Sequence, residues 1–182
     1  DSESPGRNYM VDFDVRMIDM ESLMANQTQL DVVWRNISLR NEKGFQTENM
    51  ATTIAYRFPG EGSIEELSVG ERAEETENTR VNWVAFKQQF FSSVLIAENN
   101  FDYASMRYTT FPEGSEELKS FNATMSIPYS KLTTDYKFQF YFGPNKYSIL
   151  NKCVSENDEP LYLERLIPLG WGIFGWVNRW FV

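Results

Sequence analysis

Apolar and polar side chains alternate with a period of two along most of this chain. The clearest case covers residues 9–17, where every odd-numbered position is apolar and positions 12, 14 and 16 are charged. Successive side chains of an extended strand point to opposite faces, so this alternation is typical of β-strands with one buried and one solvated face. The pattern constrains the chain to build sheets whose apolar faces pack against each other.

The alternation and its interruptions predict nine strands. These strands follow one another closely and few helical stretches lie between them, which favours antiparallel pairing over β-α-β units. We therefore expect an all-β fold, an antiparallel β-sandwich. The expected strands cover residues 9–17, 30–35, 54–58, 63–69, 81–86, 90–97, 101–108, 121–127 and 136–142.

Three further segments carry local signals. A turn is expected at Glu98-Asn99-Asn100, because these polar residues separate two strand patterns. Residues 146–153 are expected to form a short helix. The charge-dense stretch GERAEETENTR, residues 70–80, indicates a solvated loop or a short exposed helix.

The composition excludes several classes of function. The 182 residues carry a net charge of −9, which repels phosphate backbones, so we expect no nucleic-acid partner. The sequence has no histidine, which excludes histidine-based nucleophilic sites and the commonest zinc-ligand sets. No apolar run reaches the roughly 20 residues that a membrane-spanning helix needs. We expect no catalytic residue, no cofactor and no metal site.

Adjacent carboxylates occur at Glu65-Glu66, Glu74-Glu75 and Glu116-Glu117, and glycosidases also use paired acids. Neighbouring residues of a strand point to opposite faces, however, and these pairs lie among other charges or near turns. We expect all three pairs to be solvated surface. The single cysteine, Cys153, has only Lys152 as a neighbouring cation and is expected to be a partly buried small side chain rather than a nucleophile.

The final segment, LGWGIFGWVNRWFV, holds three tryptophans, two phenylalanines and one charge. Wound as a helix, it places most of its apolar side chains on one broad face, with Trp171 on the polar side. Tryptophan settles at the level of lipid headgroups, so our hypothesis is a helix lying flat on a membrane. The alternative is a helix docked over the sandwich. The predicted membrane-interface residues are Trp171, Ile173, Phe174, Trp176, Val177, Trp180 and Phe181.

The chain is thus expected to divide into a β-sandwich domain over residues 1–168 and an interfacial helix over residues 169–182. Within the sandwich, the stretch 81–97 is apolar on both faces and therefore reads as a covered strand pair. We expect Trp83 and Phe90 of this stretch to lie in the core.

Two stretches of the sandwich, and the segment that follows it, resemble a known family. RVNWVAFKQQFFSSVLI, residues 80–96, resembles the Trp-Val-Ala…Gln-Gln-aromatic-Phe segment in the periplasmic domain of YidC-family membrane protein insertases. FYFGPNKYSIL, residues 140–150, resembles the family's strand that ends in Gly-Pro before a short helix, and residues 168–182 resemble its Gly-Trp-rich helix. The residues that carry the two sandwich motifs are Trp83, Val84, Ala85, Gln88, Gln89, Phe90, Phe91, Gly143 and Pro144.

This resemblance implies a β-supersandwich of the galactose-mutarotase type, on the periplasmic side of the inner membrane, with a membrane span following residue 182. It implies an accessory domain that assists insertion and folding of inner-membrane proteins by binding rather than catalysis. The implied partners are accessory subunits of the Sec translocon and nascent membrane proteins, besides the membrane surface itself. Two alternatives stay open: a carbohydrate-binding or sugar-processing sandwich, and an extracellular lectin-like or adhesion module.

Overall fold

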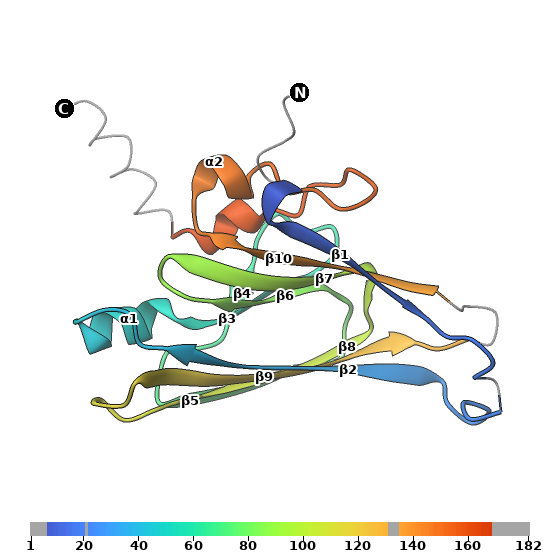
Figure 1. Cartoon of the computed structure of the whole chain (residues 1–182), viewed down its shortest axis with the longest axis horizontal. Coiled ribbons are helices and arrows are strands. Elements are labelled where there is room, and N and C mark those ends of the chain that lie inside the picture. The colour runs from blue at the N-terminus through green and yellow to red at the C-terminus, as the bar shows by residue number, and fades with distance from the viewer. Residues whose placement is uncertain (1–6, 21, 131–134, 169–182) are drawn as a thin grey trace.

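Two antiparallel sheets stack on each other in the computed structural model, which describes residues 7–20, 22–130 and 135–168 (Figure 1). This architecture confirms the predicted all-β sandwich. The six-stranded sheet has the order β1 (Met10–Arg16), β10 (Asp135–Pro144), β7 (Phe91–Phe101), β6 (Val81–Lys87), β3 (Thr53–Arg57) and β4 (Glu65–Glu66). The four-stranded sheet has the order β2 (Gln29–Leu39), β9 (Glu117–Pro128), β8 (Tyr103–Thr110) and β5 (Arg72–Glu77).

The main core lies between the two sheets and consists of the apolar positions of the alternating strands. Its centre is a stack of rings from both layers. Phe86 of β6 stacks on Trp34 of β2 with 3.9 Å between ring centroids, and on Phe121 of β9 with 4.9 Å. Aromatic side chains bury large areas, so this stack ties the two sheets together.

A second core covers the outer face of the six-stranded sheet. The chain returns over this face after β10 and forms α2 (Tyr147–Leu150) and the 3-10 helix η2 (Leu163–Leu166), so a short helix confirms the prediction for residues 146–153. Trp83 of β6 is fully buried there, and its Nε1 donates a hydrogen bond to the carbonyl oxygen of Leu161 at 2.9 Å. β6 is therefore buried on both faces, as its continuous apolar sequence predicts.

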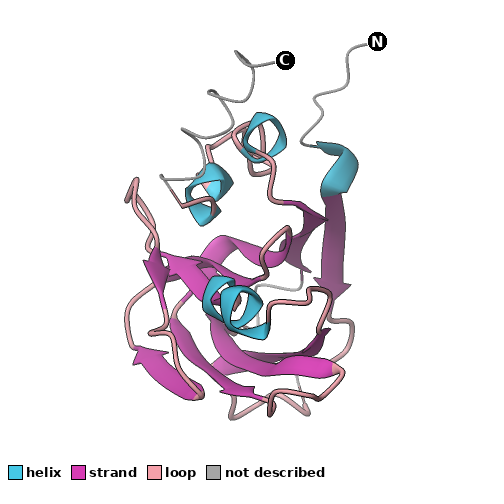
Figure 2. Ribbon diagram, turned by 90° about the vertical axis from the view of Figure 1, so that its left-hand side faces the viewer, coloured by secondary structure: helices cyan, strands magenta, loops and turns pink. Residues whose placement is uncertain are grey.

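The helix α1 (Phe45–Ala51) lies at one end of the sandwich, and Figure 2 looks onto that end. Lys119 of β9 holds it in place: the buried ammonium donates to the carbonyl oxygens of Asn49 and Thr52 and lies 4.1 Å from the centroid of the Tyr108 ring. The remaining helical element is η1 (Arg7–Tyr9). Within the described residues, no helix is long and apolar enough to cross a membrane.

The prediction for residues 70–80 is wrong, because β5 occupies most of this stretch. It pairs with β8 from Arg72 opposite Thr109 to Glu77 opposite Ala104. β5 is an edge strand, and charged side chains on an edge discourage pairing with other chains. The many charges of this stretch, which suggested a loop, thus belong to an exposed edge strand.

The predicted turn at residues 98–100 is also wrong. β7 continues to Phe101, and the chain then turns at Asp102 and enters β8 in the other sheet. Asn100 has a φ of 63°, a left-handed conformation that asparagine tolerates better than most residues. Polar residues here mark a bend from one sheet to the other rather than a hairpin.

Candidate binding groove

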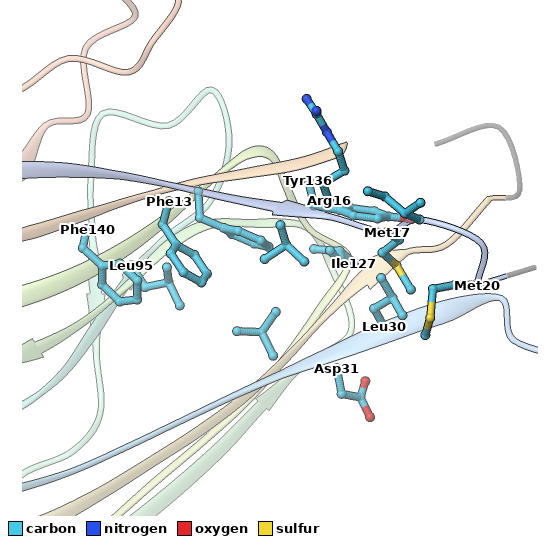
Figure 3. Close-up of a pocket in the computed structure, with 14 residues that line it drawn as sticks. Phe13, Arg16, Met17, Met20, Leu30, Asp31, Leu95, Ile127, Tyr136 and Phe140 are labelled. Atoms are coloured by element: carbon cyan, nitrogen blue, oxygen red, sulfur yellow. The ribbon is translucent and has the colours of Figure 1, made fainter. Parts of the chain in front are cut away.

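A groove of about 650 Å³ lies between β1 and β10 of one sheet and β2 and β9 of the other (Figure 3). β1 and β2 are both edge strands, and among the described strands β1 pairs only with β10 and β2 only with β9. The sandwich is therefore open along this side, and part of the apolar interior remains accessible from it.

Apolar side chains form most of the groove. Phe13 on β1 is 49% exposed and packs edge-on against Phe140, with 6.1 Å between centroids. Two methionines add side chains that adapt to irregular apolar surfaces. The apolar lining residues are Phe13, Val15, Met17, Ile18, Met20, Leu30, Val32, Leu95, Ile127, Tyr136, Phe138 and Phe140.

Two charged side chains, Arg16 and Asp31, also line the groove, and both have partners. Arg16 Nε donates to Asp135 Oδ1 at 2.7 Å, and Asp31 Oδ1 accepts a hydrogen bond from Ser126 Oγ at 2.6 Å. Burial raises the pKa of Tyr136 above its ordinary value, so its hydroxyl stays neutral. This arrangement suits the binding of an apolar chain segment, because it offers apolar contact area and no pair of facing acids or bases.

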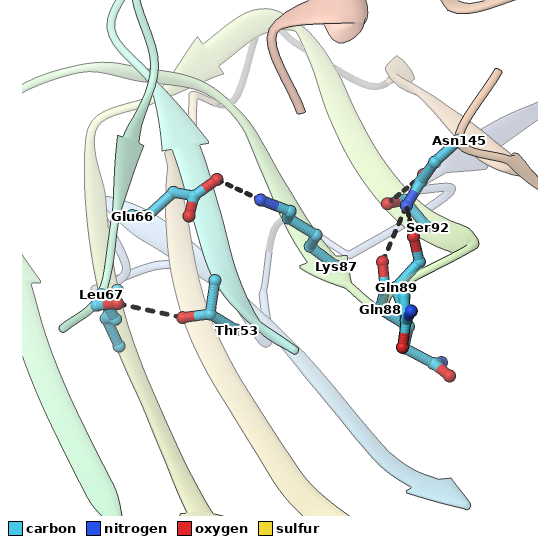
Figure 4. A network of polar contacts seen from close by, with 8 residues as sticks. All are labelled: Thr53, Glu66, Leu67, Lys87, Gln88, Gln89, Ser92 and Asn145. Atoms are coloured by element: carbon cyan, nitrogen blue, oxygen red, sulfur yellow. Dashed lines mark hydrogen bonds and ion pairs between the residues drawn. The ribbon is translucent and has the colours of Figure 1, made fainter. Parts of the chain in front are cut away.

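The structure brings the two family motifs together at the β6–β7 turn (Figure 4). Asn145, next to the Gly-Pro motif, donates from Nδ2 to the carbonyl oxygen of Gln88 at 2.7 Å and from its backbone N–H to that of Phe90 at 2.7 Å. Ser92 Oγ donates to Asn145 Oδ1 at 2.7 Å. One asparagine thus holds the whole turn by hydrogen bonds.

Gly143 occupies a position with no room for a side chain. A Cβ atom built there would lie 2.6 Å from the hydroxyl oxygen of Tyr141 and 2.9 Å from Cδ1 of Tyr9. Tyr141 is fully buried and donates its hydroxyl to the carbonyl oxygen of Pro144 at 2.7 Å. The Gly-Pro pair therefore allows Tyr141 to fold back against its own strand.

The model of the YidC periplasmic domain matches residues 5–182. The chain belongs to the YidC periplasmic domain family. Curated relatives named membrane protein insertase YidC are 41% identical in Phocaeicola vulgatus, 36% in Parabacteroides distasonis and 34% in Bacteroides fragilis. These alignments cover 95–96% of this chain but 28% of each relative, so the chain spans about a quarter of their length.

Within this YidC-family fold, the motif residues have different environments. Trp83, Val84 and Ala85 are fully buried, which confirms the expected burial of Trp83, although the layer above it is formed by α2 and η2 rather than by the second sheet. The expected burial of Phe90 is wrong: its side chain is 45% exposed. Phe91 is 59% exposed. Phe90 lies in the β6–β7 turn and Phe91 is the first residue of β7, where the strand pair ends, so the described residues cover both side chains only in part.

The carboxylate pairs are not arranged as facing acids. Glu66 forms an ion pair with Lys87, with 2.6 Å between Oε1 and Nζ, while Glu65 is its exposed neighbour on β4. Glu74 and Glu75 alternate between the two faces of β5. Cys153 is buried, and burial raises the pKa of its thiol to about 12, which agrees with the expected packing role.

The predicted membrane-interface residues, Trp171 to Phe181, lie outside the described residues. Lys119 is the structural residue that sequence reasoning missed. It lies two positions before Phe121, in phase with the inward-facing apolar residues of β9, and this phase is the signal that could have shown it facing the interior. Only the opposing position of α1, more than sixty residues earlier, gives its ammonium two carbonyl acceptors.

Proposed function

We propose that this domain is the periplasmic accessory module of a membrane protein insertase, and that its groove holds apolar segments of client polypeptides. The observation that carries the proposal is the apolar groove between the open edges of β1 and β2. An extended segment can pair with a free strand edge while its side chains enter the groove. The domain then assists insertion and folding by binding, without chemistry.

Family membership supports the location and the role. The relatives carry the name membrane protein insertase, and the matched family model is that of a periplasmic domain. We place the domain on the periplasmic side of the inner membrane, close to accessory subunits of the Sec translocon and to nascent membrane proteins. Residues 169–182 contact the membrane surface in this arrangement. Neither the family nor the relatives' names support the carbohydrate-binding alternative.

A peptide titration tests the groove. Phe13→Asp places a charge in the apolar lining, whereas Val33→Asp makes the same change on the outer face of β2. The two side chains are similarly exposed, at 49% and 53%. We expect Phe13→Asp to weaken the binding of a labelled peptide that carries an apolar segment by about tenfold, because an ionised carboxylate opposes an apolar ligand. Val33→Asp should bind like the unchanged chain.

The readout is fluorescence anisotropy of the peptide, with thermal unfolding of each variant measured in parallel. Equal affinities for the unchanged chain and both variants would contradict the groove as the binding site. Loss of binding in Val33→Asp alone would assign the site to the outer face of the four-stranded sheet.

A further inference from the structure

A second apolar surface lies at the end of the sandwich where α1 is found, away from the groove. It includes Phe90 of the β6–β7 turn, Met50 of α1, and Ile167 and Pro168, which line one hollow, together with Phe91, the exposed first residue of β7. Met50 is 65% exposed, Phe91 59% and Phe90 45%. We call these five residues the exit surface, because the described chain leaves the sandwich at Pro168.

The exposed phenylalanines are not on a loose loop. Their turn is closed by a hydrogen bond from the N–H of Gln88 to the carbonyl oxygen of Phe91 at 2.9 Å. Asn145 then fixes the turn from the neighbouring strand by the bonds already described (Figure 4). A rigid support that keeps two adjacent aromatic side chains in water is costly unless something apolar covers them.

Four of these five residues, all except Phe91, line a hollow of about 640 Å³ whose lining carries no net charge. Its two ionisable lining residues are Lys87 and Glu66, and they pair with each other at 2.6 Å. The net charge of −9 on the chain is therefore carried elsewhere. An apolar, electrically neutral surface fits the interfacial region of a bilayer of neutral lipid, where charge contributes nothing to binding.

The sequence beyond Pro168 identifies the occupant. Pro168 lines the hollow, and the fourteen residues that follow hold three tryptophans and two phenylalanines with Arg179 as the only charge. Segments of this composition partition into the membrane interface. The relatives of this chain are named membrane protein insertases. Pro168 lines the same hollow as Phe90 and Met50, so a membrane that binds the segment after Pro168 is the occupant that best suits the exit surface.

We infer that the exit surface docks on the lipid bilayer, with Phe90, Phe91 and Met50 inserted at headgroup level. The folded domain then has its own membrane contact, in addition to the segment that follows it. The groove is lined by residues 13, 15 and 16 of β1 and 30–32 of β2, among others, and shares no residue with the exit surface, so docking on the exit surface leaves the groove residues uncovered.

An environment-sensitive label tests this contact in the complete 182-residue chain. Phe91→Cys supplies one reactive thiol for an NBD dye, because Cys153 is buried and its pKa is about 12. Val33→Cys is the matched control, since Val33 is 53% exposed on the outer face of the opposite sheet. With neutral phosphatidylcholine vesicles we expect the emission at position 91 to shift to the blue and to rise several-fold. The emission at position 33 should not change.

A second variant measures the contribution to affinity. Phe90→Ser combined with Phe91→Ser should lower the partition coefficient on the same vesicles by about tenfold, because two phenylalanines no longer leave water. Its melting temperature should match that of the unchanged chain, since both side chains are half exposed. Phe13→Asp in the groove should leave vesicle binding unchanged, so failure of the groove proposal and failure of this inference are distinguishable.

Three results would overturn the inference. The first is an unchanged emission at position 91 when vesicles are added, whether or not the chain binds them. The second is a blue shift without lipid that grows with protein concentration, which would assign the surface to a second copy. The third is a lipid-free emission that differs between the complete chain and a chain ending at Pro168, which would show that residues 169–182 cover the surface.

Discussion

The indole of Trp83 and the backbone of Leu161, 78 positions apart, are joined by a hydrogen bond of 2.9 Å that links β6 to the segment covering it. Trp83 has no exposed surface, and Leu161 is buried beside it. This bond and the surrounding leucines hold the returning chain on the outer face of the six-stranded sheet. Trp83 therefore belongs to a strand of the sheet and also holds the segment that packs on the outer face of that sheet.

Trp83→Ala should lower the free energy of unfolding by about 3–5 kcal/mol, because it removes a large buried side chain and leaves a cavity. Trp83→Phe keeps most of the contact area but leaves the carbonyl oxygen of Leu161 without its donor, so it should cost less, about 1–3 kcal/mol. Urea unfolding followed by circular dichroism measures both. Phe90→Ala, at a 45% exposed position, is the control and should change stability by less than about 1 kcal/mol. A Trp83→Ala variant as stable as the control would show that the outer core contributes little.

Gly143→Ala should destabilise the domain by about 1–3 kcal/mol, because the new methyl group would overlap the buried ring of Tyr141. Gly62→Ala is the matched control: nothing lies within 4 Å of a Cβ built at that position. Thermal unfolding of the two variants side by side checks the difference. Equal melting temperatures would mean that Tyr141 moves aside without cost, and the close approach would not explain the glycine.

Lys119 should make the stability of the domain depend on pH in the alkaline range. Burial lowers the pKa of its ammonium from 10.5 to about 8. Between these values the unfolded chain binds more protons than the native state, so the contribution of Lys119 to stability rises with pH. From pH 7 to pH 9.5 this rise amounts to about 2 kcal/mol. The Lys119→Met side chain fills a similar volume, and this variant should not show the rise in stability with pH.

The measurement is the difference in unfolding free energy between the unchanged chain and the Lys119→Met variant at each pH. Cys153 acts in the opposite direction, because its pKa is raised from 9.0 to about 12 and the native state then holds its proton longer than the unfolded chain. Cys153 therefore lowers the free energy of unfolding by about 1 kcal/mol at pH 9.5. This loss is the same in both chains and cancels in the difference. Parallel pH curves for the two chains would contradict the buried, protonatable state of Lys119.

The sequence-based predictions succeeded where one local pattern decides the structure. The alternation over residues 9–17 and 121–127 corresponds to β1 and β9, because a period of two is the pattern of an extended strand. The apolar face of β9 is buried as expected, whereas that of β1 stays partly exposed along the groove. The double-sided apolar pattern at Val81–Lys87 corresponds to a strand covered on both faces. The family motifs were also recognisable, since they are contiguous stretches.

Other features depend on what lies opposite in space. Residues 72–77 form a strand because β8 offers them a free edge, although their own charges argue against it. Phe90 is exposed because the strand pair ends beneath it, although the strands β6 and β7 on either side of the turn are largely buried. Burial of one side chain depends on the element that covers it, and that element comes from elsewhere in the chain.

The sequence by itself determined the fold class, most of the strands and the family, because these follow from periodicity and from short contiguous motifs. Only the tertiary structure decided that β1 and β2 leave the sandwich open between them, that Asn145 fixes the β6–β7 turn, and that Lys119 is buried beneath α1. The second and third features join segments that are 57 and 70 residues apart, and the first arises because the consecutive strands β1 and β2 pair with β10 and β9 rather than with each other. Such contacts arise from the packing of whole sheets, whose energy is summed over many residues and leaves no local signal in the chain.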